Sequence, residues 1–230
     1  MRVLLLALAL AGCEPRFRGP PVRPPAQYGV RGIDVSHHQG WVDWPRVAES
    51  REVSFVFVKA TEGTTHVDRR FHRNWAGARE AGLRVGAYHY FSLCRTGADQ
   101  AAHFIATVPR VPDGLPPVVD IEADRRCNRD DRLARTGVEV AAWVDAVQAH
   151  FGVRPLVYAS SSFERTHLAP AGIGGPLWLA AYTRSPRNRG WTFWQYTDRG
   201  RVPGIRGPVD GNVFHGTLEA LHRIGGEPTP

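Results

Sequence analysis

The chain has 230 residues, of which 43% are hydrophobic and 22% are charged, and this globular composition excludes wholesale disorder. Its three cysteines are too few for a disulfide-rich miniature scaffold or a four-cysteine zinc site. The formal net charge is +7, but the basic residues are scattered and no nucleic-acid-binding motif accompanies them, so we expect no nucleic-acid partner.

The N-terminal segment has the pattern of an export signal. One arginine precedes a short apolar run, residues 3–10, whereas a membrane-spanning helix needs about 20 apolar residues. The run ends at residues 10–13 (LAGC), which resemble a bacterial lipobox, whose cysteine is lipidated and becomes the mature N-terminus. We predict a lipoprotein-type signal over residues 1–12 and a lipid anchor on Cys13. The alternative is an ordinary cleaved signal with an incidental cysteine.

Residues 13–29 are predicted to be an extended tether. Prolines recur through this segment, and each lacks an N–H donor and fixes φ, so a helix cannot form. In the lipoproteins that the segment resembles, Asp after the lipidated cysteine favours the inner membrane. Glu14 stands there, so we expect the outer membrane, facing the periplasm. The folded domain is predicted at 30–224, followed by a tail at 225–230.

Export also bears on the other two cysteines. With Cys13 lipidated, Cys94 and Cys127 remain as one pair in an oxidising compartment, where a disulfide forms readily. The sequence therefore predicts a bridge between them. Two free, inert thiols are the alternative.

From Val30 onward, short apolar runs alternate with helical segments. The predicted strands are 32–36, 54–60, 84–90, 117–122, 155–159, 177–182, 192–196 and 209–214, and the predicted helices are 68–81, 99–107 and 132–150. Nearly continuous apolar runs are typical of parallel strands buried on both faces. The sequence predicts an α/β fold, an irregular TIM-like β/α barrel with about eight strands and fewer helices in its C-terminal half. An open doubly wound sheet is the alternative.

The most informative strand is 117–122, which ends in two carboxylates. Side chains alternate along a strand, so Asp120 and Glu122 share a face at its C-terminal end, where barrel enzymes place catalytic groups. Neighbouring carboxylates raise one pKa, which suits an acid that stays protonated beside an ionised partner. The pair predicts acid/base catalysis, although ordinary surface strands also carry such pairs.

Two more aspartates fall on the first and last predicted strands. Closing a barrel brings these strands together, so Asp210 would lie beside Asp34, and Asn212 shares the face of Asp210. Turn or helix-cap roles are the alternatives for both aspartates. His37 and His38 follow the first strand, but adjacent side chains on an extended chain face opposite ways, so we expect no metal site there.

Aromatic residues accompany these strand ends. Flat rings can hold sugar rings, whose C–H faces are apolar, although each ring taken alone fits a core position better. The predicted substrate-binding residues are Tyr88, Tyr90, Tyr158, Trp178, Tyr182, Gln195 and Asn212.

Together these motifs resemble the family 25 glycoside hydrolases, the lysozyme-like N-acetylmuramidases. The matching segments are GIDVS at 32–36, KATEG at 59–63, GAYHYF at 86–91, DIE at 120–122, WQY at 194–196 and DGNVF at 210–214. The resemblance implies an irregular β/α barrel that hydrolyses the β-1,4 bond between N-acetylmuramic acid and N-acetylglucosamine, without a metal or organic cofactor. The cysteine pair resembles that of a Gram-negative subgroup, whereas the lipobox and the basic tether are not a general feature of the family. We therefore expect a Gram-negative, lipoprotein-type member.

The resemblance also implies roles for the four acidic residues. Glu122 would be the general acid that protonates the leaving oxygen, and afterwards the base that activates water. Asp120 would stabilise positive charge at the anomeric carbon, or orient the substrate's N-acetyl group as an internal nucleophile. Asp34 and Asp210 would position the substrate and tune the pKa of Glu122.

Three other interpretations remain open at this point. They are a chitinase-like N-acetylhexosamine hydrolase, a metal-dependent polysaccharide deacetylase using His37, His38 and the aspartates, and a non-catalytic wall-binding lipoprotein. We expect the partners to be peptidoglycan glycan strands, with a membrane contact through Cys13 and a monomeric protein.

Overall fold

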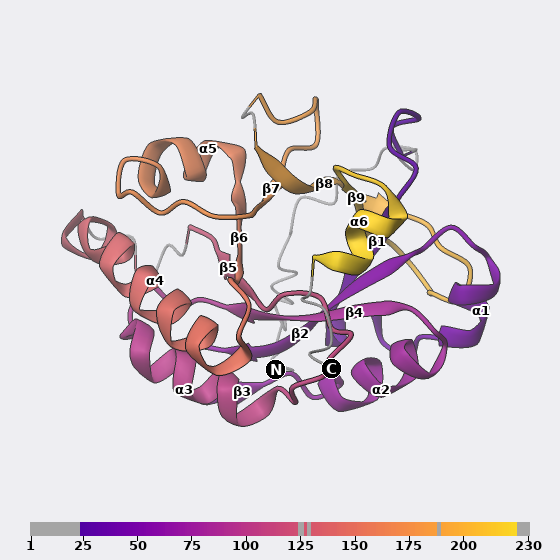
Figure 1. The fold of residues 1–230 in the computed structure, drawn as a ribbon, viewed down its shortest axis with the longest axis horizontal. Helices are drawn as coiled ribbons and strands as arrows, with labels where there is room; N and C mark the ends of the chain where they lie inside the picture. Colours follow the sequence, from indigo (N-terminus) through magenta and orange to yellow (C-terminus); the bar gives the residue numbers. More distant parts are fainter. Residues whose placement is uncertain (1–23, 124–126, 128–129, 188–189, 225–230) are drawn as a thin grey trace, which may run out of the picture.

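The computed structural model describes residues 24–123, 127, 130–187 and 190–224 (Figure 1). The predicted signal, Cys13, most of the tether and the tail lie outside the described residues. The strands are β1 (Arg31–Val35), β2 (Phe55–Glu62), β3 (His66–Val67), β4 (Arg84–Tyr90), β5 (Val118–Ile121), β6 (Leu156–Ser160), β7 (Leu177–Ala180), β8 (Trp191–Gly200) and β9 (Val209–Phe214). The helices are α1 (Trp44–Glu49), α2 (Phe71–Glu80), α3 (Gly97–Thr107), α4 (Asp130–Phe151), α5 (Ser161–Phe163) and α6 (Leu218–Arg223), with a 3-10 turn η1 (His37–Gln39) and a π-helical segment η2 (Glu164–Leu168).

Eight of these strands close into a barrel. Their hydrogen-bonded order is β1-β9-β8-β7-β6-β5-β4-β2, and pairing of β2 with β1 closes the ring, while β3 attaches to β2 alone. Within the eight-stranded ring, neighbouring strands are parallel except that β9 runs antiparallel to both β8 and β1. The predicted irregular barrel is confirmed, and its closure excludes the open sheet.

The helices follow the prediction with adjusted ends. Those predicted at 99–107 and 132–150 are α3 and α4, while the one predicted from residue 68 begins at Phe71. Asp68 lies before the helix. Its carboxylate accepts hydrogen bonds from the backbone N–H of Arg70 and of His37, both at 2.9 Å. Figure 1 shows α2, α3 and α4 on one side of the barrel, and the described residues between β7 and β9 contain no helix, as predicted. None of the helices in the described ranges is long and apolar enough to cross a bilayer.

Alternating side chains on the strands separate two cores. On β2, Val56 and Val58 belong to the core beneath the helices, whereas Phe55 and Phe57 fill the barrel interior. On β5, the same alternation sends Val118 inward. Asp120, two residues further along β5, therefore points inward as well, above a floor of packed aromatic rings.

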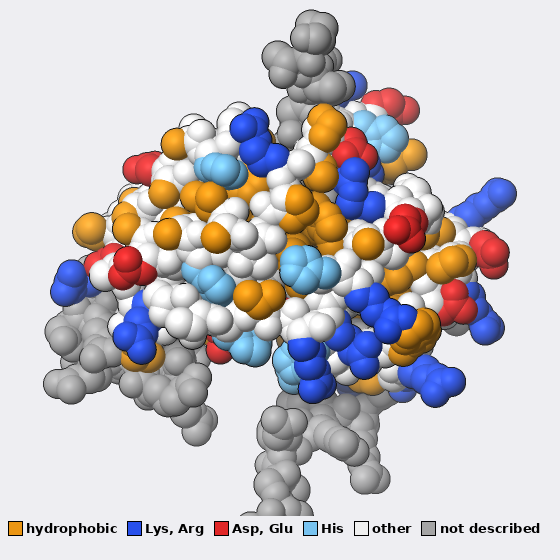
Figure 2. Space-filling view, turned by 90° about the horizontal axis from the view of Figure 1, so that it is seen from below, with side chains coloured by type: hydrophobic (Ala, Val, Ile, Leu, Met, Phe, Trp, Pro, Cys, Tyr) orange, Lys and Arg blue, Asp and Glu red, His pale blue; other side chains and the backbone are white. Residues whose placement is uncertain are grey.

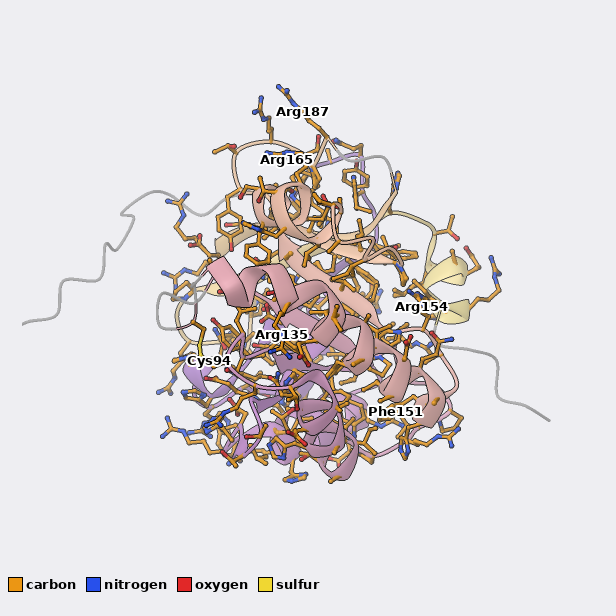
Figure 3. The ribbon with its side chains drawn as sticks, turned by 90° about the vertical axis from the view of Figure 1, so that its left-hand side faces the viewer. Cys94, Arg135, Phe151, Arg154, Arg165 and Arg187 are labelled. Atoms are coloured by element: carbon orange, nitrogen blue, oxygen red, sulfur yellow. A yellow bond between two sulfur atoms is a disulfide. The ribbon has the colours of Figure 1, made fainter. Side chains whose placement is uncertain are left out.

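Cys94 and Cys127 form a disulfide, with their Cα atoms 5.4 Å apart (Figure 3). The bridge spans 33 residues and ties the segment after β4 to the segment after β5. On the chain-entropy view, closing a loop of this length contributes roughly 3–4 kcal/mol to stability. Because both segments follow the C-terminal ends of neighbouring strands, the bridge holds that end of the barrel together.

Gly97 sets how closely α3 and α4 approach. An added Cβ there would collide with the backbone carbonyl of Glu139, whose carboxylate also accepts the Gly97 N–H at 2.8 Å. Since the helices would have to separate, we expect Gly97→Ala to lower the free energy of unfolding by about 1–3 kcal/mol, measured by thermal unfolding. Gly29→Ala is the control because an added Cβ there meets nothing within 4 Å. Equal losses in both variants would contradict this packing argument.

Candidate active site

A cleft of about 350 Å³ lies at the end of the barrel where the parallel strands terminate. All four predicted acidic residues line it: Asp34, Asp120, Glu122 and Asp210. Asp34 lies near the end of β1 and Asp120 near the end of β5, while Asp210 comes at the start of the antiparallel β9. Asp34 and Asp210 are direct partners in the β1–β9 register, as barrel closure predicted.

Asp34 is held by two side-chain amides. Its Oδ2 accepts hydrogen bonds from Gln195 Nε2 at 2.9 Å and from Asn212 Nδ2 at 2.8 Å. Asn212 is itself fixed, because its Oδ1 accepts a hydrogen bond from Trp178 Nε1 at 2.8 Å. Asn212, predicted to bind substrate, is fully buried and is not among the residues that line the cleft. It orients Asp34 instead.

Asp34 and Asp210 each affect the pKa of the other. Burial, repulsion from Asp34 and a hydrogen bond to Asp34 raise the pKa of Asp210 to about 9, so Asp210 keeps its proton near neutral pH. Burial also raises the pKa of Asp34, but the hydrogen bonds from Asn212, Gln195 and Asp210 oppose that shift. Asp210 therefore donates the hydrogen bond between the two carboxyls, and the hydrogen bonds that Asp34 accepts favour its charged form.

Asp120 and Glu122 differ in exposure. Asp120 is 7% exposed, and its buried Oδ1 has no hydrogen-bond partner within the described part of the chain. Burial and repulsion from Glu122 raise the pKa of Asp120 well above its ordinary value. Glu122 lies one residue beyond β5 and is open to solvent, yet desolvation of its carboxyl by the cleft walls and repulsion from Asp34 raise its pKa too. A solvent-accessible carboxyl with a raised pKa is suited to donating a proton near neutral pH.

The one lysine of the chain faces this acidic cluster. Lys59 is 9% exposed; its Nζ lies 2.7 Å from Glu62 Oε2 and 4.7 Å from the centre of the Tyr90 ring. Its positive charge lowers the pKa of both Asp120 and Glu122, against the effect of burial. Sequence reasoning used Lys59 only as part of a motif. The alternation that sends Phe55 and Phe57 inward could have placed it at the cleft.

We expect Lys59→Met to move the pH profile of kcat/KM toward higher pH. Loss of the positive charge raises the pKa of Glu122, so the general acid stays protonated to higher pH and the alkaline limb moves up. It also raises the pKa of Asp120, so the acidic limb moves up as well. A shift of about 0.5–1 pH unit in both limbs is expected, measured between pH 4 and 9. Lys59→Arg keeps the charge and should keep the profile. Loss of rate with both limbs unmoved would show that Lys59 acts by packing alone.

Six of the seven predicted substrate-binding residues line the cleft: Tyr88, Tyr90, Tyr158, Trp178, Tyr182 and Gln195. The hydroxyls of Tyr158 and Tyr182 donate to Gln195 Oε1 at 2.9 and 2.7 Å, which fixes the amide that holds Asp34. Tyr182 is 49% exposed and offers an open ring face. Trp178 is instead a core residue, because its ring stacks on Phe57 with centroids 4.6 Å apart.

The histidines after β1 are arranged differently from the prediction. The expectation that their side chains face opposite ways is wrong, because Ser36 caps a 3-10 turn in which the rings of His37 and His38 lie 4.0 Å apart. His37 Nδ1 contacts Asp68 Oδ2 at 2.7 Å, while His38 lines the cleft with Ser36. Among the described residues, no group of three or more His, Cys, Asp or Glu is placed to hold a metal ion. Sequence reasoning missed Gln39, in η1, and Asp198, on β8, which also line the cleft.

Comparison with known proteins matches this geometry to one family. The family model for glycosyl hydrolases family 25 matches residues 33–205. The chain is 43% identical to the uncharacterized protein YegX of Escherichia coli K12 over 87% of this chain and 75% of that protein. It is 34% identical to Lysozyme M1 of Streptomyces globisporus over 87% and 72% of the two chains. A family 25 glycosyl hydrolase from Bacillus anthracis superposes with a TM-score of 0.78 at 33% identity, over 89% of this chain and 97% of that one. The chain therefore belongs to glycosyl hydrolase family 25 and is a glycoside hydrolase.

Proposed function

We propose that this glycoside hydrolase cleaves peptidoglycan at the β-1,4 bond between N-acetylmuramic acid and N-acetylglucosamine. The observation that carries the proposal is the convergence of Asp34, Asp120, Glu122 and Asp210 on one tyrosine-lined cleft. The similarity to Lysozyme M1 supports the same substrate.

Glu122 is proposed as the proton donor. Its accessible carboxyl protonates the glycosidic oxygen as the bond to the anomeric carbon breaks, and the resulting carboxylate then takes a proton from the attacking water. Asp120 stabilises the positive charge that develops meanwhile. Its unpartnered Oδ1 is available to accept the N–H of the substrate's acetamido group, whose oxygen can close on the anomeric carbon as an internal nucleophile.

Asp34 and Asp210 are proposed to support this pair from the opposite wall. The ionised Asp34 repels negative charge on Glu122, so it helps to keep the acid protonated before reaction. Tyr182, with its exposed ring, is proposed as a stacking surface for a sugar.

Product analysis tests the proposed bond. Digestion of purified peptidoglycan should release fragments that end in reducing N-acetylmuramic acid, identified by borohydride reduction and mass spectrometry. Reducing N-acetylglucosamine, or faster cleavage of chitin oligomers, would favour a chitinase-like enzyme instead. Deacetylation that a chelator stops would indicate a metal-dependent deacetylase, and binding without release of fragments would indicate a wall-binding protein.

We also propose that the protein is exported and anchored through Cys13 in the cell envelope, in the outer membrane facing the periplasm. The lipobox-like residues 10–13 support the anchor, and the Cys94–Cys127 disulfide fits an oxidising compartment. Metabolic labelling with a radioactive fatty acid should mark the wild-type protein and leave Cys13→Ser unlabelled. Label on Cys13→Ser, or none on the wild type, would contradict the anchor.

A further inference from the structure

A second groove, of about 440 Å³, lies between the start of α1 and the segment that joins β8 to β9. We call it the Trp41 groove; its lining residues are Trp41, Asp43, Arg46 and residues 202–206. Its two walls are fixed to each other, because Val42 and Ile205 form a β-bridge and the Asp43 N–H donates to the carbonyl of Gly204 at 2.9 Å. The groove is therefore built into the fold.

The same two stretches of chain line the catalytic cleft and, a few residues further along, the Trp41 groove. Gln39 and Asp198 line the cleft, whereas Trp41 and residues 202–206 line the groove. Gln39 and Trp41 are two residues apart, so their Cα atoms are separated by no more than about 7 Å. A polymer that fills the cleft would thus bring its substituents within reach of the groove.

The chemistry of the groove differs from that of the cleft. Trp41 is 58% exposed, and the guanidinium carbon of Arg73 lies 3.2 Å from the centre of its ring. Arg46 and Arg206 are exposed, and none of these three arginines takes part in an ion pair within the described ranges. Figure 2 shows Lys and Arg side chains gathered with exposed hydrophobic ones at the lower right of that face.

Among the described residues, Asp43 is the one acidic residue that lines the Trp41 groove. Its Oδ1 accepts the backbone N–H of Arg46 at 3.3 Å as the cap of α1. The groove thus keeps an excess of positive charge beside an indole face. An arginine guanidinium can bind a carboxylate through two parallel hydrogen bonds. The Trp41 indole, stacked against the Arg73 guanidinium, offers a rigid apolar surface beside the arginines.

We propose that the Trp41 groove binds the carboxylate-bearing peptide that peptidoglycan carries on the lactyl group of muramic acid. The inference deepens the proposed function and rests on it. In peptide-bearing strands the lactyl carboxyl of muramic acid is consumed in the amide bond to the peptide, so the carboxylates of the peptide supply the anion that the arginines match. The peptide joins the glycan at the very sugar whose bond is cut, which places it close to the cleft. Occupation of the groove would favour strands that still carry their peptides.

Two forms of the same substrate test this inference. Glycan strands with intact peptides are compared with strands from which an N-acetylmuramoyl-L-alanine amidase has removed them and whose freed lactyl carboxylates are capped as methylamides, and kcat/KM is measured on each. We expect the wild type to favour peptide-bearing strands by about tenfold, as one charged contact would supply. Arg46→Gln combined with Arg206→Gln, and separately Trp41→Ala, should bring this ratio close to one, with the rate on stripped strands unchanged.

The controls separate the inference from the proposed function. Arg223→Gln removes an exposed arginine from the last turn of α6, which follows β9 and lies away from the cleft, and should keep the wild-type ratio. Equal wild-type rates on both substrates, or groove variants that keep the preference, would overturn the inference and leave the muramidase proposal intact. Failure of the wild type to cleave either substrate would overturn both. Loss of activity on stripped strands in the groove variants would show a general defect and also contradict the inference.

Discussion

Glu122→Gln is expected to lower kcat on peptidoglycan by roughly 10²–10⁴-fold, because an amide cannot deliver the proton that the leaving oxygen needs. The side chain lies just beyond β5 and is open to solvent, so the change should leave the melting temperature within about 1 °C of the wild type. Release of reducing ends from peptidoglycan measures the rate. Thermal unfolding of the same preparation shows whether the protein is folded.

A matched carboxylate in the same cleft serves as the control. Asp198 also lines the cleft, but its side chain is half exposed and contacts Arg199, so Asp198→Asn should cost less than about tenfold. A synthetic substrate with a nitrophenolate leaving group needs little protonation, and Glu122→Gln should recover much of its rate on it. Near-normal cleavage of peptidoglycan by folded Glu122→Gln would refute the assignment of the acid.

Barrel closure is what made the site predictable before any coordinates. The alternation along 117–122 places Asp120 and Glu122 on one face, and closing the ring brings Asp210 to Asp34. Both inferences depend only on the alternation of side chains along a strand and on the order of the strands. Short apolar runs in the sequence indicate where the strands lie. The fold and its four carboxylates were therefore accessible from sequence.

Side-chain contacts and local turns were less accessible. The 3-10 turn after β1 depends on reciprocal hydrogen bonds between Ser36 and Gln39, and periodicity carries no information about them. The role of Asn212 depends on its hydrogen bonds with Trp178 and Asp34, which lie far from each other in the sequence. Helix α1 was overlooked although Asp43 followed by Pro45 is a recognisable helix start.

Asp120→Asn is expected to lower kcat on peptidoglycan by about 10²–10³-fold, because the neutral amide cannot balance positive charge at the anomeric centre. This loss should persist on the nitrophenyl substrate, since a better leaving group does not remove that charge. The two variants are thereby distinguished, because only Glu122→Gln should recover there. Asp120 lies on β5 and is nearly buried, so Asn, which has the same shape, is the replacement least disruptive to packing.

The pH profile of Asp120→Asn separates an electrostatic role from a structural one. The charge of Glu122 raises the pKa of Asp120, and ionisation of Asp120 shapes the acidic limb of kcat/KM. Asp120→Asn removes that ionisation, so the acidic limb should flatten, whereas Lys59→Met only shifts it. If Asp120 served only to pack the end of β5, the limb would stay in place while the melting temperature fell. A folded variant with an unmoved limb and full recovery on the nitrophenyl substrate would contradict the charge-stabilising role.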